Sequence, residues 1–205
     1  MRTTLISTTP NAEQLIGYCA RVSSDNQSNP EVARLLRYCI DHGHWSVFEQ
    51  AYMTIEIETS RAISMQILRH KSFDFQQHSQ RYAAVQTFEP VRARRQAEKN
   101  RQSSVDDLSD TDRDWWDATY NEVTSSALKL YNEALSRGIA KECARFLLPE
   151  SSSTKMYMTG NIRSWIHYIQ LRTKEDTQLE HREIAEACKA IFVKELPIIS
   201  EALGW

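Results

Sequence analysis

The sequence predicts an α+β protein with one small mixed or antiparallel sheet and a larger set of helices. Two observations carry this prediction. Residues 52–58 alternate strictly between apolar and polar side chains, which is typical of a half-buried strand. Most of the chain after residue 111 instead repeats its apolar residues at helical spacing. Strands followed by a run of helices indicate the α+β class.

The first part of the chain predicts a strand at residues 1–7 and two helices after it. The second helix opens at Asn29-Pro30, because proline suits the first turn of a helix. We expect this helix to end near Gly43, since glycine is the usual residue just past a helix end. Its apolar stripe consists of Val32, Leu35, Leu36, Cys39 and Ile40.

A strand followed by a helix is predicted next. Met53, Ile55 and Ile57 share one face of the strand, and Ser60 can cap the helix that follows. This helix delivers the basic residues of segment 69–71 at or near its end. The later helices are expected at residues 111–136, 141–148, 153–172 and 178–195, with prolines ending the second and the fourth.

Residues 88–114 form a polar excursion, part helix and part loop. Arginines from Arg92 to Arg101 are followed closely by aspartates, and no aromatic residues lie among them. A solvated surface segment is therefore favoured over a nucleic-acid contact.

Composition describes an ordinary globular chain. Its 205 residues, 41% of them hydrophobic, suffice for one domain spanning residues 1–205, and a formal net charge of −2 gives no general attraction to nucleic acid. We expect no membrane span and no leader segment, hence a cytoplasmic protein. The four cysteines lie far apart in helical patterns, which indicates buried free thiols. With only five glycines, never clustered, both common phosphate-binding glycine motifs are excluded.

Segment 69–82 is the densest polar stretch. It combines cations, amides, hydroxyls and aromatic rings. Arginine can fork onto phosphate oxygens, glutamine can pair with ring edges, and aromatic rings can stack, so the mixture suits a planar heterocycle joined to phosphate. A charged, solvent-facing helix end is the alternative interpretation of the same residues.

The pattern Arg69-His70-Lys71, seven residues, Ser79 resembles the signature of the flavin-dependent thymidylate synthases, in which the third position is arginine. Further residues stand in the order and spacing of that family and extend the resemblance over most of the chain: His42-Gly43-His44, Phe48-Glu49, Arg145, Pro149, Asn161, Arg163 and Leu171-Arg172.

The resemblance implies an enzyme that converts dUMP to dTMP. FAD would be reduced by NADPH, and methylenetetrahydrofolate would donate the carbon. The family's homotetramer implies sites shared between subunits. The implied flavin contacts are Ser46, Arg69, His70, Lys71, Gln77, Asn161, Ile162, Arg163 and His167, with His44 beside the flavin and folate. The implied dUMP contacts are Gln66, Ile67, Leu68, Arg69, Gln77, His78, Ser79, Gln80, Arg81, Arg145 and Arg172.

Arg145 and Arg172 lie on predicted helices among apolar residues, where an arginine needs a fixed anion. That anion is either the ligand or an internal carboxylate, and the motif favours the ligand. Arg172 is the implied catalytic residue, since a cation against the uracil carbonyls favours ionisation at N3 and pushes electron density toward C5.

Other reactive residues receive no catalytic role. No cysteine lies in a polar motif suited to a nucleophile, and no local His-Asp relay would activate Ser79. His42 and His44 have no further ligand pattern, so no metal site is predicted.

The chain also departs from the family pattern at Lys71, Asp74, His167 and Asp176. Lys71 keeps the charge of the usual arginine but loses its planar fork. Two other functions stay open: a related enzyme that hydroxymethylates dUMP, and a non-catalytic module that binds a nucleotide or RNA.

Overall fold

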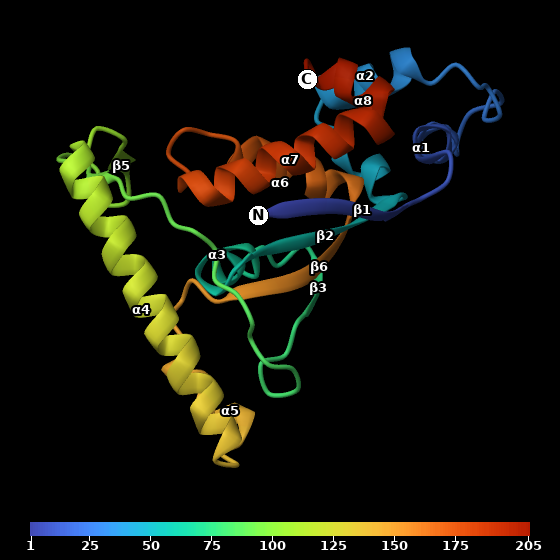
Figure 1. Ribbon diagram of the computed structural model, residues 1–205. Coiled ribbons are helices and arrows are strands. Elements are labelled where there is room, and N and C mark those ends of the chain that lie inside the picture. Colours follow the sequence, from blue (N-terminus) through green and yellow to red (C-terminus); the bar gives the residue numbers. More distant parts are fainter.

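The computed structural model describes residues 1–205, and a four-stranded antiparallel sheet lies at its centre. The strand order is β1-β2-β6-β3, and helices α6 and α7 lie across one face of the sheet (Figure 1). The sheet strands are β1 (Arg2–Thr8), β2 (Tyr52–Ser60), β3 (Asp74–Gln77) and β6 (Ser153–Asn161), and a separate hairpin joins β4 (Arg95–Gln96) to β5 (Ser104–Val105).

Helices make up the larger part of the fold, which confirms the predicted α+β class. They are α1 (Ala12–Ala20), α2 (Ala33–Asp41), α3 (Arg61–Ile67), α4 (Asp110–Ser136), α5 (Lys141–Ala144), α6 (Ile162–Arg172), α7 (Leu179–Glu195) and α8 (Pro197–Leu203), with 3-10 helices η1 (Trp45–Glu49) and η2 (Arg145–Leu147). None of these helices combines the length and the apolar character needed to cross a bilayer.

The predicted strand-to-helix unit is confirmed at β2 and α3. Met53, Ile55 and Ile57 are fully buried, and the residues between them are only half-buried. The Ser60 hydroxyl caps α3 by accepting a hydrogen bond from the Ile63 amide at 3.3 Å. Helix α3 ends at Ile67, so the basic signature residues lie just beyond a fixed helix end.

The prediction of one helix over residues 153–172 is wrong in its first half. Residues 153–161 form β6, the strand between β2 and β3. Thr154, Met156 and Met158 point into the core, while the residues between them are more exposed. This alternation has the period of a strand. Helix α6 begins only at Ile162, where the Asn161 side chain accepts a hydrogen bond from the Ser164 amide at 2.8 Å.

Three smaller expectations also need correction. Helix α2 begins at Ala33, so Pro30 lies before the helix rather than in its first turn. The polar excursion contains the β4–β5 hairpin, which has no strong alternation in the sequence. Cys39 and Cys188 are buried free thiols as expected, but Cys19 is half-buried and Cys143 is exposed.

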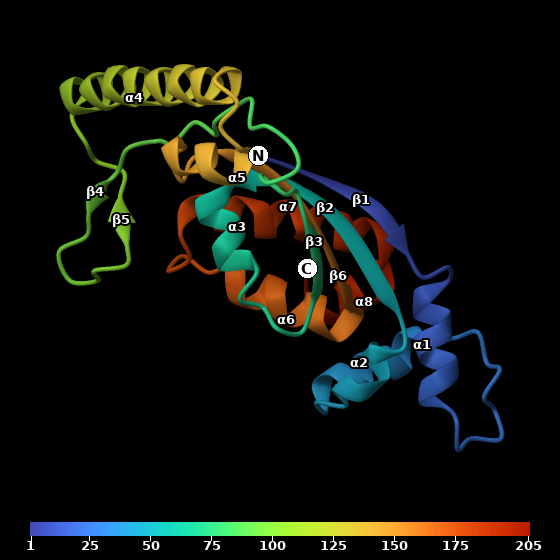
Figure 2. The same ribbon diagram turned by 90° about the horizontal axis from the view of Figure 1, so that it is seen from below.

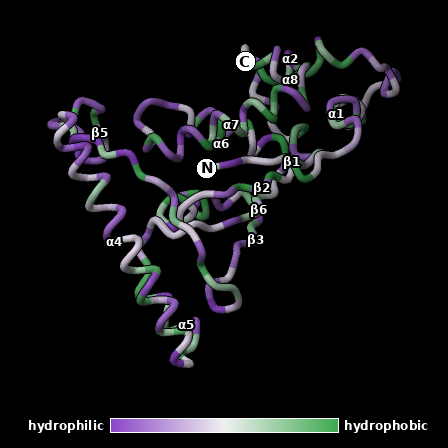
Figure 3. The backbone as a smooth tube through the Cα atoms, viewed as in Figure 1, coloured by the Kyte–Doolittle hydropathy of each residue, from purple (hydrophilic) through white to green (hydrophobic).

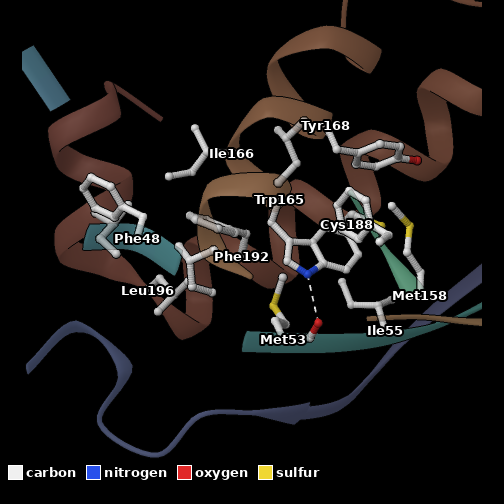
Figure 4. Close-up of a cluster of buried hydrophobic side chains, with 14 of the residues drawn as sticks. Phe48, Met53, Ile55, Met158, Trp165, Ile166, Tyr168, Cys188, Phe192 and Leu196 are labelled. Atoms are coloured by element: carbon white, nitrogen blue, oxygen red, sulfur yellow. Dashed lines mark hydrogen bonds between the residues drawn. The ribbon is translucent and has the colours of Figure 1, made fainter. Parts of the chain in front are cut away.

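The hydrophobic core fills the space between the sheet and helices α6 and α7 (Figure 4). Trp165 lies at its centre, fully buried, and its indole N–H donates a 2.9 Å hydrogen bond to the Met53 carbonyl. The bond satisfies the one polar atom of the ring and ties α6 to β2. Because α6 is held in this way against β2, the outer residues of α6 have fixed positions.

Helix α4 forms a long arm at one side of the body, with α5 at one end and the hairpin at the other (Figures 1 and 2). Trp116 donates a hydrogen bond to the Val91 carbonyl at 2.8 Å, and Tyr131 packs with Ala134 and Ala144 in a small separate cluster. The half of the arm toward the hairpin is mainly hydrophilic, and hydrophobic residues become more frequent toward α5 (Figure 3).

Candidate active site

A cleft of about 620 Å³ opens beside the first turns of α6. Helical spacing places Arg163, His167 and Gln170 along this cleft, while Trp45 and Ser72 line it from other segments. Asn161, the cap of α6, lines it as well. Three of the predicted flavin contacts, Asn161, Arg163 and His167, are thus brought together.

Two other predicted flavin contacts lie next in sequence to residues that line this cleft. Ser46 follows Trp45, and Lys71 precedes Ser72; both side chains are exposed. Arg163 forms an ion pair with Glu49, but both side chains are well exposed, so solvent screens this pair. Arg69 and Lys71 have no carboxylate within ion-pair distance. Their charges are available to an anion.

A second group of residues gathers at the end of α6, where Arg172 meets the signature. The Arg172 Nε–H donates to His70 Nε2 at 2.9 Å. His70 therefore accepts at Nε2 and is neutral, with its proton on Nδ1. The His70 ring also packs edge-on against Tyr168, with ring centroids 4.9 Å apart.

Burial and charge keep both histidines of this group neutral. Burial, followed by the charge of Arg172, lowers the pKa of His70 from 6.5 to about 4. The same two causes in the same order lower the pKa of His181 to about 3. Burial also raises the pKa of Tyr168 well above its usual value. Arg172 is therefore the cation of a group that otherwise carries no charge.

Arg172 and Arg145 both lack the internal carboxylate that was one of their two predicted partners. Arg172 bonds only to His70, and the Arg145 guanidinium lies 5.6 Å from the centre of the Phe146 ring. Both side chains are half-buried. Each therefore presents a positive charge that the protein itself does not neutralise.

Arg145 lies in another cleft, of about 380 Å³, together with Gln80. Arg81 pairs instead with Glu142 at 3.0 Å, and Ser79 is exposed. Gln77 points inward and donates to the hydroxyls of Ser64 at 2.8 Å and Thr154 at 3.2 Å.

The remaining predicted contacts are more scattered. His78 lines a further cleft, beside residues of β2 and β6, and its Nδ1 is buried without a partner. Ile67 and Ile162 are fully buried, so their backbone atoms alone could meet a ligand. Leu68 is half-buried, and His44 is exposed. The predicted residues thus fall on several surfaces of one chain.

Several residues of these surfaces carry no signal in the sequence. Tyr168 and His181 complete the group around His70, and Trp45, Ser72 and Gln170 line the α6 cleft. Each is a single polar or aromatic residue within or beside a helical pattern. Such residues are more often ordinary packing partners, so periodicity alone would not select them.

Comparison with known proteins gives one consistent result. The sequence profile of the Thy1 family, described as thymidylate synthase complementing protein, matches residues 4–198. A probable flavin-dependent thymidylate synthase of Paramecium bursaria Chlorella virus 1 is 55% identical over 95% of this chain and 91% of its own. A flavin-dependent thymidylate synthase of Synechocystis is 52% identical over 94% of this chain and 90% of its own.

Among solved structures, a similar fold is that of the UMP/dUMP methylase PolB from Streptomyces cacaoi, bound with 5-Br dUMP. The two superpose with a TM-score of 0.88 at 25% sequence identity, over 99% of this chain and 94% of the other. The agreement extends over the sheet, the helices above it and the α4 arm, because nearly all of both chains takes part.

Proposed function

The chain belongs to the thymidylate synthase complementing protein family, the flavin-dependent thymidylate synthases, and we infer that it converts dUMP to dTMP with a bound flavin. One observation in the structure carries the proposal for the site. Four cations at the predicted contacts, Arg69, Lys71, Arg145 and Arg172, have no carboxylate partner. Unpaired cations suit an anionic ligand.

The residues of the α6 cleft fit FAD. Arg69 and Lys71 would meet its phosphates, while Asn161, Arg163 and His167 offer hydrogen bonds along the cleft wall. When bound, the flavin supplies the reducing equivalents that complete the methyl group. The protein's own contribution is to bind and orient: the capped start of α6 holds Asn161 and Arg163 in place.

We propose that Arg172 polarises the uracil of dUMP. The Arg172 guanidinium donates only its Nε–H to His70. Its two terminal nitrogens therefore stay free for carbonyl oxygens. A cation there favours the anionic form of the base and raises the electron density at C5. Arg145 and Gln80, in their own cleft, would bind the nucleotide phosphate or sugar. The dUMP analogue in the Streptomyces relative agrees with this ligand class.

NADPH and methylenetetrahydrofolate are the co-substrates that we propose. The exposed rings of Tyr38 and His44, whose centroids lie 5.7 Å apart beside η1, offer planar surfaces near the α6 cleft. A pteridine or nicotinamide ring can stack on such surfaces. A cytoplasmic location stays a prediction from composition.

We also propose that the enzyme is a homotetramer whose sites take residues from more than one subunit. The predicted contacts lie on separate surfaces of one chain, so a single chain does not gather them around one ligand. Large hydrophobic residues are exposed on the arm and at its end, among them Val123, Leu130 and Phe146. Exposed apolar area of this kind marks protein interfaces.

The alternative of an RNA-binding module is disfavoured by the contacts of the arginine run. Arg92, Arg94 and Arg95 each form an ion pair, with Asp106, Glu180 and Asp107 respectively. These charges are neutralised within the chain. They offer little to a phosphate backbone.

The test is anaerobic incubation of the purified protein with FAD, NADPH, methylenetetrahydrofolate and dUMP, followed by mass analysis of the nucleotide. We expect the mass gain of one methyl group. A gain matching hydroxymethyl would identify the related hydroxymethylase instead. Unchanged dUMP, despite bound flavin and bound nucleotide, would refute the synthase function. Omission of FAD is the matched control and should leave dUMP unchanged.

A further inference from the structure

A continuous chain of hydrogen bonds links the polar excursion to the predicted nucleotide contact Gln66. Arg94 binds Glu180 through both terminal nitrogens, at 2.7 and 2.9 Å. Glu180 Oε2 accepts a hydrogen bond from the Gln178 side chain at 2.9 Å. Gln178 Oε1 in turn accepts one from the Gln66 side-chain Nε2 at 2.6 Å. The next member of this series is His181, whose Nδ1 lies 3.3 Å from Gln66 Oε1.

The direction of this chain follows from Glu180. An ionised carboxylate can only accept hydrogen bonds, so Gln178 must turn its NH₂ group toward Glu180 and its oxygen toward Gln66. Gln66 must then present its NH₂ group to Gln178 and its oxygen to His181. His181 donates from Nδ1, which leaves Nε2 to accept from the Tyr168 hydroxyl at 3.2 Å.

Glu180 is held in its ionised form by Arg94. Both side chains of the pair are nearly buried, with exposed fractions of 10% and 11%. Burial alone would raise the pKa of Glu180, but hydrogen bonds led by that from Arg94 bring the pKa below its usual value. Arg94 is itself anchored by bonds from Nε to the Ser104 hydroxyl and from Nη1 to the Arg92 carbonyl. The hairpin thus fixes Arg94, the first residue of this chain of hydrogen bonds.

We propose that Arg94 and Glu180 are positioning residues for nucleotide binding, which act by orienting the Gln66 carboxamide and the His181 tautomer. The proposal rests on the proposed function and on the contact between Gln66 and dUMP that the family resemblance implies. It gives the polar excursion a role: its hairpin reaches over the start of α7 and fixes side chains of the nucleotide site without touching the nucleotide.

Glu180→Gln tests the proposal, because the new amide keeps the size of the side chain but no longer forces the direction of the hydrogen bonds. The dissociation constant of dUMP is measured by calorimetry on the flavin-loaded protein. We expect an increase of about tenfold, which corresponds to about 1.4 kcal/mol. Arg94→Lys, which keeps the charge and loses the fork, should give a smaller increase.

The matched control is Asp107→Asn. It weakens another arginine–carboxylate pair of the same hairpin, Arg95–Asp107, which is half-exposed and has no contact with the chain of hydrogen bonds. We expect unchanged dUMP binding in this variant. If Glu180→Gln bound dUMP as tightly as the control, the proposal would be overturned.

A second measurement separates positioning from simple loss of stability. In protein with ¹⁵N-labelled histidine, the NMR shifts of the His181 ring should show a proton on Nδ1 in the wild type and a mixture of tautomers in Glu180→Gln. An unchanged tautomer together with a lower melting temperature would show a structural role only. A wild-type protein that bound no dUMP would refute the proposed function. The tautomer measurement would still show whether Glu180 sets the direction of the hydrogen bonds.

Discussion

Replacing Arg172 by methionine tests the proposed polarisation of uracil. Methionine keeps much of the unbranched stem and removes the charge. In the folded protein the guanidinium makes one side-chain hydrogen bond, to His70, and neutralises no carboxylate. Its removal therefore leaves no buried anion. The expected cost in stability is about 1 to 3 kcal/mol, because the partly buried His70 Nε2 loses its donor.

The effect on turnover should be larger. A cation beside an acidic group lowers its pKa by about 1 to 3 units, and each unit corresponds to about 1.4 kcal/mol. If the full effect is felt in the transition state, losing Arg172 slows the reaction by about tenfold to a thousandfold. The same substitution removes one of the two main causes that lower the pKa of His70 and of His181, so both pKa values should rise.

The assay is single-turnover formation of dTMP by flavin-loaded protein at saturating dUMP, with flavin absorbance and melting temperature recorded alongside. Arg172→Lys is the companion variant, since it retains the charge without the planar fork and should recover part of the rate. Normal dTMP formation by Arg172→Met would refute the reasoning. A slow variant that had also lost its flavin would show a binding role instead.

Three further predictions concern pH, packing and assembly. His70 and His181 are neutral in the fold, with pKa values of about 4 and about 3 against 6.5 in the unfolded chain, so unfolding takes up protons. The free energy of unfolding should decrease as the pH falls from about 6.5 toward 4; urea titrations that show no slope there would contradict this. In Gly160→Ala the new Cβ would lie 2.5 Å from the Phe73 ring, which should lower stability by about 1 to 3 kcal/mol in calorimetry. An unchanged melting temperature would be the contrary result. Leu130→Glu places a charge on the exposed face of α4 and should dissociate the proposed tetramer in light scattering, whereas an unchanged mass would place the interface elsewhere.

Those parts of the fold that depend on local patterns could be predicted from the sequence. The β2 alternation and the Ser60 cap of α3 act within a few residues, so their signals survive without tertiary contacts. Strand β6 was missed although its residues also alternate with the period of a strand. Its strand conformation is stabilised by pairing on both sides with β2 and β3, although its residues lie next to a helical stripe. The helical stripe that starts at Ile162 masked the short alternation of Thr154, Met156 and Met158 just before it.

The candidate site likewise contains residues that the sequence could predict and contacts that it could not. The signature residues were found because they are neighbours in sequence, and the family resemblance added Arg145, Asn161, Arg163 and Arg172. Contacts with partners far along the chain could not be found. His70 and Arg172 are 102 residues apart, and Arg94 and Glu180 are 86 apart. Neither pair has a local pattern that would join its members.

The sequence by itself determined the fold class, the capped helix that delivers the signature, and the charges available for an anionic ligand. Only the tertiary structure decided which of those charges remain free. It paired Arg92, Arg94 and Arg95 with carboxylates, and it left Arg172 bonded to a neutral histidine. The physical reason is that ion pairing and burial depend on which distant segments meet, whereas charge and helical periodicity belong to the residues themselves.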